Sequence, residues 1–297
     1  MEPASAPSAD LQAPRERRRA DVATFGSLLA DPSATVQREV RRELERRGKP
    51  ARTILLGVAR RGEARARAAA RAVLLRQARQ SVVRRMVRLA CSPYADFERG
   101  VLLLSRFEEP GLDLRPYLLA IDAMAAEVLR RVETRRDLDG RAKVLTDYLG
   151  RELGYRGDES DYHHPDNVYL HRAILRKRGL PLTLTALYLL VARRAGIRAG
   201  AVALPGHVVL RIYAQDERSL LVDPFRGGAV LTERECLAYL AQHGLPFQPR
   251  WFDDAAGLPL WRRQVHNLRE AYRQRGLESE SALLEPLDLA LARSASG

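Results

Sequence analysis

Two polar residues that could do chemistry lie on neighbouring apolar segments in the second half of the chain. His207 begins a Val- and Leu-rich run, and Asp223 ends the next such run. If residues 214–218 close a hairpin between these runs, Val209 lies opposite Asp223, and His207 becomes a diagonal neighbour of Asp223. A carboxylate in that position holds one imidazole nitrogen and leaves the other to act as a base. Alone, a His at a strand start or an Asp before Pro is more often structural, but together they favour a His–Asp pair.

A hydroxyl that such a base could activate is found at the start of the buried helix that precedes the two runs. That helix is predicted after Pro181, because apolar residues recur at helical spacing until Gly196. Thr183 is the hydroxyl nearest its start, where a helix N-terminus stabilises an oxyanion and His207 could supply a base. The more ordinary role of Thr183 is to cap the helix, and we favour that role.

No cysteine stands at this helix start. The chain has two cysteines, Cys91 and Cys236, far apart in the sequence. They do not form a disulfide framework, so a reducing cytoplasm is the expected location. Cys236 follows both His207 and Asp223 and lies in a predicted helix, where we interpret it as a small buried apolar residue.

The segment between residues 158 and 166 invites a metal hypothesis. It contains Asp158, Glu159, Asp161, His163, His164 and Asp166. Adjacent histidines do not both face one ion on a regular element, and no His-x-x-x-His or cysteine pair accompanies them. We therefore predict a polar, solvated loop and no metal. Arg226-Gly227-Gly228 is typical of a turn and not of a phosphate loop, so no cofactor is expected.

The charge of the chain is concentrated at its N-terminal end. Residues 1–90 hold 21 Lys+Arg against 9 Asp+Glu, which accounts for almost all of the net charge of +13 over 297 residues. A basic segment over residues 15–90 could attract nucleic acid. Phe25 is its only aromatic residue, so it offers no stacking platform for single strands. No apolar run is long enough for a membrane span.

Composition and periodicity divide the chain into four parts. We expect a disordered tail over 1–20, a helical segment over 21–92, a mixed domain over 93–252 and a helical pair over 253–297. The helices expected before residue 158 are 35–47, 52–60, 63–78, 81–91, 97–107, 114–134 and 139–153. From residue 158 the pattern predicts a helix that Asp166 or Asn167 caps and that runs to Arg178, followed by the helix after Pro181. It then predicts strands at 199–204, 207–213 and 219–225 and a helix at 232–242. The closing helices are 260–275 and 281–292, with Pro286 kinking or delaying the second.

A set of short motifs spread over residues 97–275 resembles the SirB-one family, a transglutaminase-like group of bacterial proteins. The matching pieces are Phe97…Gly100-Val-Leu-Leu-Leu-Ser-Arg-Phe107, Glu152-Leu-Gly-Tyr-Arg-Gly157, Tyr162…Pro165…Asn167…Leu170, Arg178-Gly-Leu-Pro-Leu-Thr-Leu-Thr185, Pro205-Gly-His207 and Asp223-Pro-Phe225. Each is weak alone, and their shared order is specific. The stretch 260–276 resembles one degenerate tetratricopeptide copy, and the N-terminal helices weakly resemble a HEAT-repeat pair.

The resemblance implies an α+β fold with a transglutaminase-like core, in which a central helix packs on a small antiparallel sheet and helical segments flank it. Active relatives in the wider superfamily carry a Cys at the start of that helix, and here the corresponding positions hold Pro181, Leu182 and Thr183. Thr183, His207 and Asp223 therefore occupy the positions of a vestigial triad.

Three functional hypotheses remain open. The first is a non-catalytic module that binds a protein or peptide partner, favoured by the missing thiol and the flanking helices. The second is a hydrolase or acyl transferase that uses Thr183, His207 and Asp223, favoured by the retained His and Asp. The third and weakest is nucleic-acid binding through the Arg-rich helices.

Overall fold

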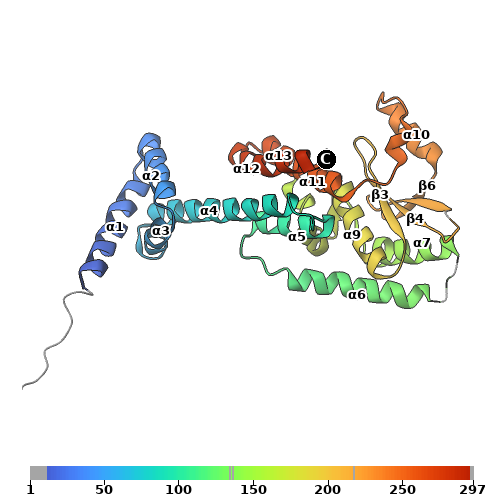
Figure 1. Cartoon of the computed structure of the whole chain (residues 1–297), viewed down its shortest axis with the longest axis horizontal. Helices are drawn as coiled ribbons and strands as arrows, with labels where there is room; N and C mark the ends of the chain where they lie inside the picture. The colour runs from blue at the N-terminus through green and yellow to red at the C-terminus, as the bar shows by residue number, and fades with distance from the viewer. Residues whose placement is uncertain (1–11, 134, 136, 217, 295–297) are drawn as a thin grey trace, which may run out of the picture. The chain divides into compact units, whose positions relative to one another are not determined.

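The computed structural model describes residues 12–133, 135, 137–216 and 218–294. The chain divides into two compact units, residues 1–81 and 82–297, and Figure 1 traces the helices and strands of each. The expected boundary near Ser92-Pro93 coincides with the end of helix α4, whereas the division between the units falls inside that helix.

The first unit is helical. It contains α1 (Gln12–Ala30), α2 (Ala34–Arg47), α3 (Lys49–Arg61) and the first part of α4 (Ala64–Ala90). Its core joins Phe25 and Leu29 of α1 to Leu44 of α2 and to Leu55 and Val58 of α3. The helices predicted at 35–47 and 52–60 are confirmed to within a few residues.

Two expectations for the N-terminal part need correction. The helices expected at 63–78 and 81–91 are one continuous helix, α4, because no Pro or Gly interrupts residues 64–90 and the apolar stripe runs on. The disordered tail expected over 1–20 is contradicted for Gln12–Ala20, which lie in α1. Residues 1–11 lie outside the described residues.

The second unit begins with helices that surround its core. They are α5 (Phe97–Glu108), α6 (Arg115–Val132) and α7 (Leu138–Thr146), which continues as a π-helical stretch, η1 (Asp147–Glu152). A short 3-10 turn, η2 (Pro165–Asn167), and α8 (Leu170–Arg176) replace the single helix expected up to residue 178. The side chain of His164 caps this turn, in place of the expected Asp166 or Asn167. The residue after α8, Lys177, has a left-handed φ of 56° and terminates that helix.

The central helix is α9 (Pro181–Arg194), and every residue from Pro181 to Ala192 is buried. It packs against α6 on one side and against strands β3 (Ala199–Val202) and β4 (Val209–Tyr213) on the other. Helices apolar all round are typical of domain interiors, so this burial explains the long Leu-rich run. Figure 1 shows α9 beside the sheet.

The sheet has four antiparallel strands in the order β3-β4-β5-β6, with β5 at Ser219–Asp223 and β6 at Ala229–Leu231. Leu210 pairs with Val222 and Tyr213 with Ser219, which confirms the hairpin register predicted from the 214–218 loop. Strand β6 is an unpredicted short edge strand. A separate parallel pair joins β1 (Arg156–Gly157) to β2 (Arg178–Gly179).

The C-terminal part is helical. It contains α10 (Glu233–Gln242), η3 (Pro249–Phe252), α11 (Gly257–Gln274), α12 (Glu278–Leu283) and α13 (Glu285–Ser294). Pro286 lies in the first turn of α13, so the delay expected at this proline is observed as a break between α12 and α13. The result is an α+β fold in which a small antiparallel sheet packs on a central helix flanked by helical segments.

Candidate functional site

The structure brings the imidazole of His207 and the carboxylate of Asp223 together. His207 precedes β4 and follows a turn in which Gly206 has a φ of 77°, while Asp223 is the last residue of β5. The Nε2 atom of His207 lies 2.9 Å from Oδ2 of Asp223. The contact follows from the hairpin register, because the two residues lie on one face as diagonal neighbours.

Asp223 is almost completely buried, with 1% of its surface exposed. Its second oxygen, Oδ1, accepts hydrogen bonds from the backbone N–H groups of Phe225 at 2.9 Å and Arg226 at 3.4 Å. The Arg226 Nε atom lies 3.6 Å from Oδ2. The carboxylate therefore holds both the ring of His207 and the tight turn that follows β5.

The ring of His207 is positioned by aromatic neighbours as well. Phe225 meets it edge-on at a centroid distance of 6.1 Å, and Tyr239 of α10 lies 5.7 Å away. The Nδ1 atom makes no hydrogen bond to any residue that the structure describes. A His with one nitrogen held and the other unengaged is arranged as a base would be, but a base needs a nucleophile within reach.

The hydroxyl of Thr183, the candidate nucleophile, is engaged in a hydrogen bond in the protein interior. Its Oγ1 is buried and donates to the backbone carbonyl of Val168 at 3.2 Å. The hydroxyl of Thr185 likewise donates to the carbonyl of Val208 at 3.0 Å. The favoured capping role is also wrong, because the cap position of α9 is Leu180 and no side chain caps the helix. Both threonines tie the central helix to neighbouring segments.

The cysteines lie elsewhere. Cys91 is exposed and outside α9. Cys236 of α10 is buried, and burial raises the pKa of its thiol to about 11. Since the thiolate is the reactive form, this environment matches the expectation of a small buried apolar residue, even though Cys236 lines the same cavity as His207.

Two cavities flank the residues 206–208. One of about 390 Å³ is lined by His207, Asp223, Arg226, Cys236 and Tyr239. The other, of about 420 Å³, lies at the start of α9 and is lined by Pro181 and Leu182 together with residues of α11. Gly206 and Val208 border the second cavity, whereas His207 borders the first, so His207 turns towards α10.

Sequence reasoning missed Arg263 of α11, which lines the cavity at the start of α9 and donates from Nη2 to the His207 carbonyl oxygen at 3.1 Å. Burial lowers the pKa of its guanidinium. Its sequence context, an Arg-rich amphipathic helix, carries no signal that separates it from the exposed Arg262 beside it.

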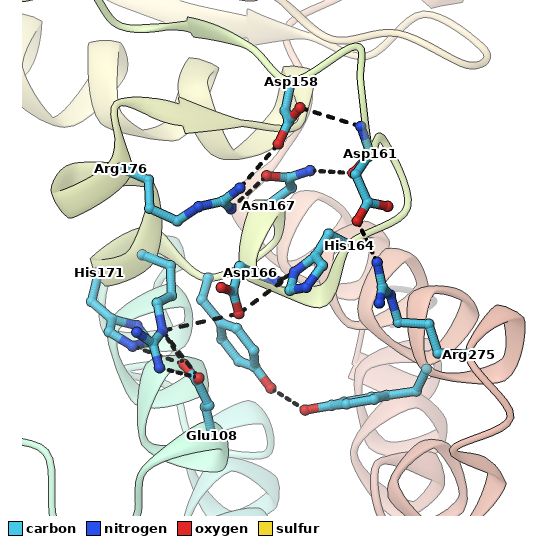
Figure 2. A network of polar contacts seen from close by, with 12 residues as sticks. Glu108, Asp158, Asp161, His164, Asp166, Asn167, His171, Arg176 and Arg275 are labelled. Carbon is cyan, nitrogen blue, oxygen red and sulfur yellow. Dashed lines mark hydrogen bonds and ion pairs between the residues drawn. The ribbon is translucent and has the colours of Figure 1, made fainter.

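The acidic segment 158–166 exposes Glu159, Asp161 and His163, as expected of a polar, solvated loop, but it also contains a structural network of polar contacts. Asp158 and Asn167 are buried, and Arg176 bridges them with hydrogen bonds of 3.0 and 2.8 Å, as Figure 2 shows. Asp161 pairs with Arg275, the residue that follows α11. Among the described residues, no group of three or more His, Cys, Asp or Glu side chains could hold a metal ion.

Arg226-Gly227-Gly228 forms a turn, as expected, with φ values of 66° and 85° at the two glycines. Within the described part of the chain, no helix has the length and apolar character needed to cross a membrane.

Comparison with known proteins places these features in a family. A family model described as "Transglutaminase-like superfamily" matches residues 115–266, which include α9, the sheet, His207 and Asp223. No solved structure gives a significant match.

The curated relatives match over part of their length. A "UPF0162 protein" of Xylella fastidiosa (strain 9a5c) is 32% identical over 142 residues, covering 48% of this chain and 50% of that protein. "F-box only protein 21" of Homo sapiens is 29% identical over 191 residues, covering 61% of this chain and 29% of that protein. The chain thus spans about half, or less, of the length of these two relatives. Because the family model covers more than half of the chain, the chain belongs to the transglutaminase-like superfamily.

Proposed function

We propose that this chain is a non-catalytic protein- or peptide-binding module built on the transglutaminase-like fold, of the SirB-one type. The proposal rests on the types of residue found at the start of α9. There Pro181, Leu182 and Thr183 offer no thiol, and the one hydroxyl is buried and hydrogen-bonded to Val168.

The His–Asp pair supports this proposal once its structural role is considered. Asp223 accepts hydrogen bonds from the ring of His207 and from two backbone N–H groups, so it organises the end of β5 without any reaction. An unpaired buried polar group costs about 1–3 kcal/mol. The His207–Asp223 pair satisfies such groups, so it stabilises the fold of a protein that carries out no reaction.

The same domain type also forms part of a longer protein, because the human F-box only protein 21 matches over 29% of its length. The occurrence of this domain as one part of a longer protein supports a role as an interaction module. We extend the proposal to the flanking helices: a HEAT-like N-terminal unit and a degenerate tetratricopeptide-like C-terminal pair that add binding surface, in a cytoplasmic protein.

Nucleic-acid binding through residues 15–90 ranks below this proposal. On α2, Arg42 pairs with Glu39, and Arg46 and Arg47 pair with Glu43, so part of the positive charge is compensated within the helix.

Selection of random displayed peptides against the purified chain tests the binding role. Enriched peptides should bind the wild type and lose about tenfold or more in affinity to His266→Trp, which fills the cavity at the start of α9. Arg193→Trp, an exposed change at the other end of α9, should leave binding unaffected.

Amine incorporation and amide hydrolysis by the same preparation test the absence of catalysis. We expect no turnover above the blank. Turnover that survives Cys91→Ala/Cys236→Ala and disappears in His207→Gln would overturn the proposal and restore an enzyme that uses His207 as a base.

A further inference from the structure

The cavity at the start of α9 contains a cation without an acidic partner. Arg263 lies at its wall, and its guanidinium makes one hydrogen bond within the described structure, from Nη2 to the His207 carbonyl oxygen. No carboxylate of a described residue lies within ion-pairing distance of it. Arg263 is half-buried, and desolvation lowers the pKa of its guanidinium.

Some partly buried arginines of the same unit have acidic partners, whereas Arg106, Arg141 and Arg178 donate to backbone carbonyls. Arg172 pairs with Glu108, Arg269 pairs with Asp288 at 2.5 Å, and Arg176 pairs with Asp158 at 3.0 Å. Burying a charge is costly unless it is paired. Arg263 therefore places a positive charge, and N–H donors that no described residue accepts, at the wall of this cavity.

The remaining walls also favour an anion. His163, His266 and Asn267 offer further donors. The cavity also meets the first turn of α9, where the backbone N–H groups of Leu182 and Thr183 have no acceptor among the described residues. Helix N-termini carry a partial positive charge.

One carboxylate, that of Glu270, does line this cavity. It accepts hydrogen bonds from Arg273 and Gln274 of its own helix. Arg273 compensates its charge, so Glu270 does not neutralise Arg263.

We propose that this cavity binds a carboxylate carried by a peptide, with Arg263 as the counter-ion. The inference rests on the proposed binding function and adds the chemical class of the ligand. The volume of this cavity, about 420 Å³, is within the size range of small-ligand pockets. It admits the end of a peptide or one acidic side chain.

NMR titration of the isotope-labelled full chain tests the proposal with three probes. The first is N-acetyl-trialanine with a free C-terminal carboxylate, the second is the same peptide as its C-terminal amide, and the third is an amide-capped alanine peptide with one central Glu. We expect saturable shifts at the amides of Leu182, Gly206 and Asn267 with the first or the third probe. The fully uncharged amide should bind about tenfold or more weakly, because it loses charge-assisted hydrogen bonds. The comparison between the first and third probes distinguishes a chain terminus from an acidic side chain.

Variants assign the interaction to Arg263. Arg263→Gln keeps a donor for the His207 carbonyl but removes the charge, and it should lose binding about tenfold or more. Arg193→Gln removes one charge from the exposed C-terminal end of α9, away from the cavity, and should bind as the wild type does. Urea unfolding of each variant tests whether that variant is folded. The comparison of the carboxylate and amide probes uses the wild-type chain and does not depend on any variant.

Three results would overturn the inference: equal binding of acid and amide probes, binding unaffected by Arg263→Gln, or inorganic phosphate binding more tightly than the carboxylate probes. Mass spectrometry of the probes after incubation separates this inference from the proposed function. Binding with cleavage leaves the carboxylate site standing and refutes the non-catalytic role. Intact probes without binding refute the carboxylate site alone.

Discussion

The Nε2 atom of His207 and the Oδ2 atom of Asp223 lie 2.9 Å apart, and the other oxygen of Asp223 holds the backbone of the turn that follows β5. One buried carboxylate thus joins two neighbouring strand ends. The arrangement has the form of a catalytic His–Asp pair, yet the hydroxyl nearest the start of α9 is directed to Val168.

Asp223→Leu should destabilise the protein far more than Asp223→Asn. Leucine leaves the His207 ring and two backbone N–H groups without their acceptor, which we expect to cost about 3 kcal/mol or more. Asparagine keeps one oxygen for the backbone, and its amide can face the ring if the imidazole changes tautomer, so the cost should be about 1–2 kcal/mol. Urea unfolding monitored by circular dichroism measures both. Equal losses would show that the carboxylate does not organise the turn.

The stability of the protein should depend on Glu108 in acid. Burial, the largest single influence, raises the pKa of this carboxyl, but contacts from His171 and Arg172 outweigh it and lower the pKa from 4.5 to about 2. Because the folded pKa lies below the unfolded value, the carboxylate stabilises the fold above about pH 4.5, and this stabilisation is lost as the pH falls towards 2.

Glu108→Gln should therefore be less stable than the wild type at neutral pH, by about 1–2 kcal/mol after allowance for solvent screening. The difference should shrink as both proteins are acidified towards about pH 2.5. Urea unfolding across this range is the measurement, and Glu109→Gln, at the exposed neighbouring position, is the control. A difference between wild type and Glu108→Gln that does not change with pH would contradict the assignment.

Cys236 should resist alkylation in the folded protein. Burial raises the pKa of its thiol to about 11 from 9.0, which lowers its thiolate fraction near neutral pH by roughly 100-fold, and its burial adds a steric barrier. Iodoacetamide at neutral pH followed by peptide mass spectrometry should label Cys91 first and Cys236 only after urea is added. Rapid labelling of Cys236 in the native protein would reopen a role for its thiol beside His207.

Gly157→Ala should destabilise the turn that carries Phe225. A Cβ atom at position 157 would come within 2.4 Å of the Phe225 ring, and the Gly157 N–H donates to the Phe225 carbonyl at 2.7 Å. We expect a loss of about 1–3 kcal/mol from overpacking. Gly111→Ala, where a Cβ meets nothing within 4 Å, should change stability by less than about 0.5 kcal/mol in thermal or urea unfolding. Similar effects of the two substitutions would contradict the close packing of Phe225 on β1.

A fragment of residues 82–297 should unfold cooperatively without the first unit, whereas a fragment of residues 96–275 should not. The core of the second unit includes Val82, Val83 and Met86 from α4, and Leu287 and Leu291 from α13. The shorter fragment removes all of them, and each large buried side chain contributes about 1.5–3 kcal/mol. Urea unfolding of the two fragments decides the boundary, and a stable 96–275 fragment would favour one at Ser92-Pro93.

Much of the architecture can be predicted from residue patterns alone. The Leu-rich run after Pro181 predicts α9 because helical periodicity and a stop at Gly196 are local properties of the chain. The register of β4 and β5 can be predicted because the loop 214–218 determines which residues lie opposite and side chains alternate between the two faces. His207 and Asp223 can therefore be paired before any coordinates are known.

The partners of the other polar groups depend on the tertiary structure. The sequence marks Thr183 as a cap or a nucleophile, yet its hydroxyl donates to Val168, which the fold brings alongside from another segment. Arg263 lies 56 positions beyond the carbonyl to which it donates, in a helix that carries several other arginines. Periodicity and propensity determine elements because they act over a few residues. The acceptor, burial and ionisation of a polar side chain depend on which distant segments become its neighbours, and only the packed structure decides that.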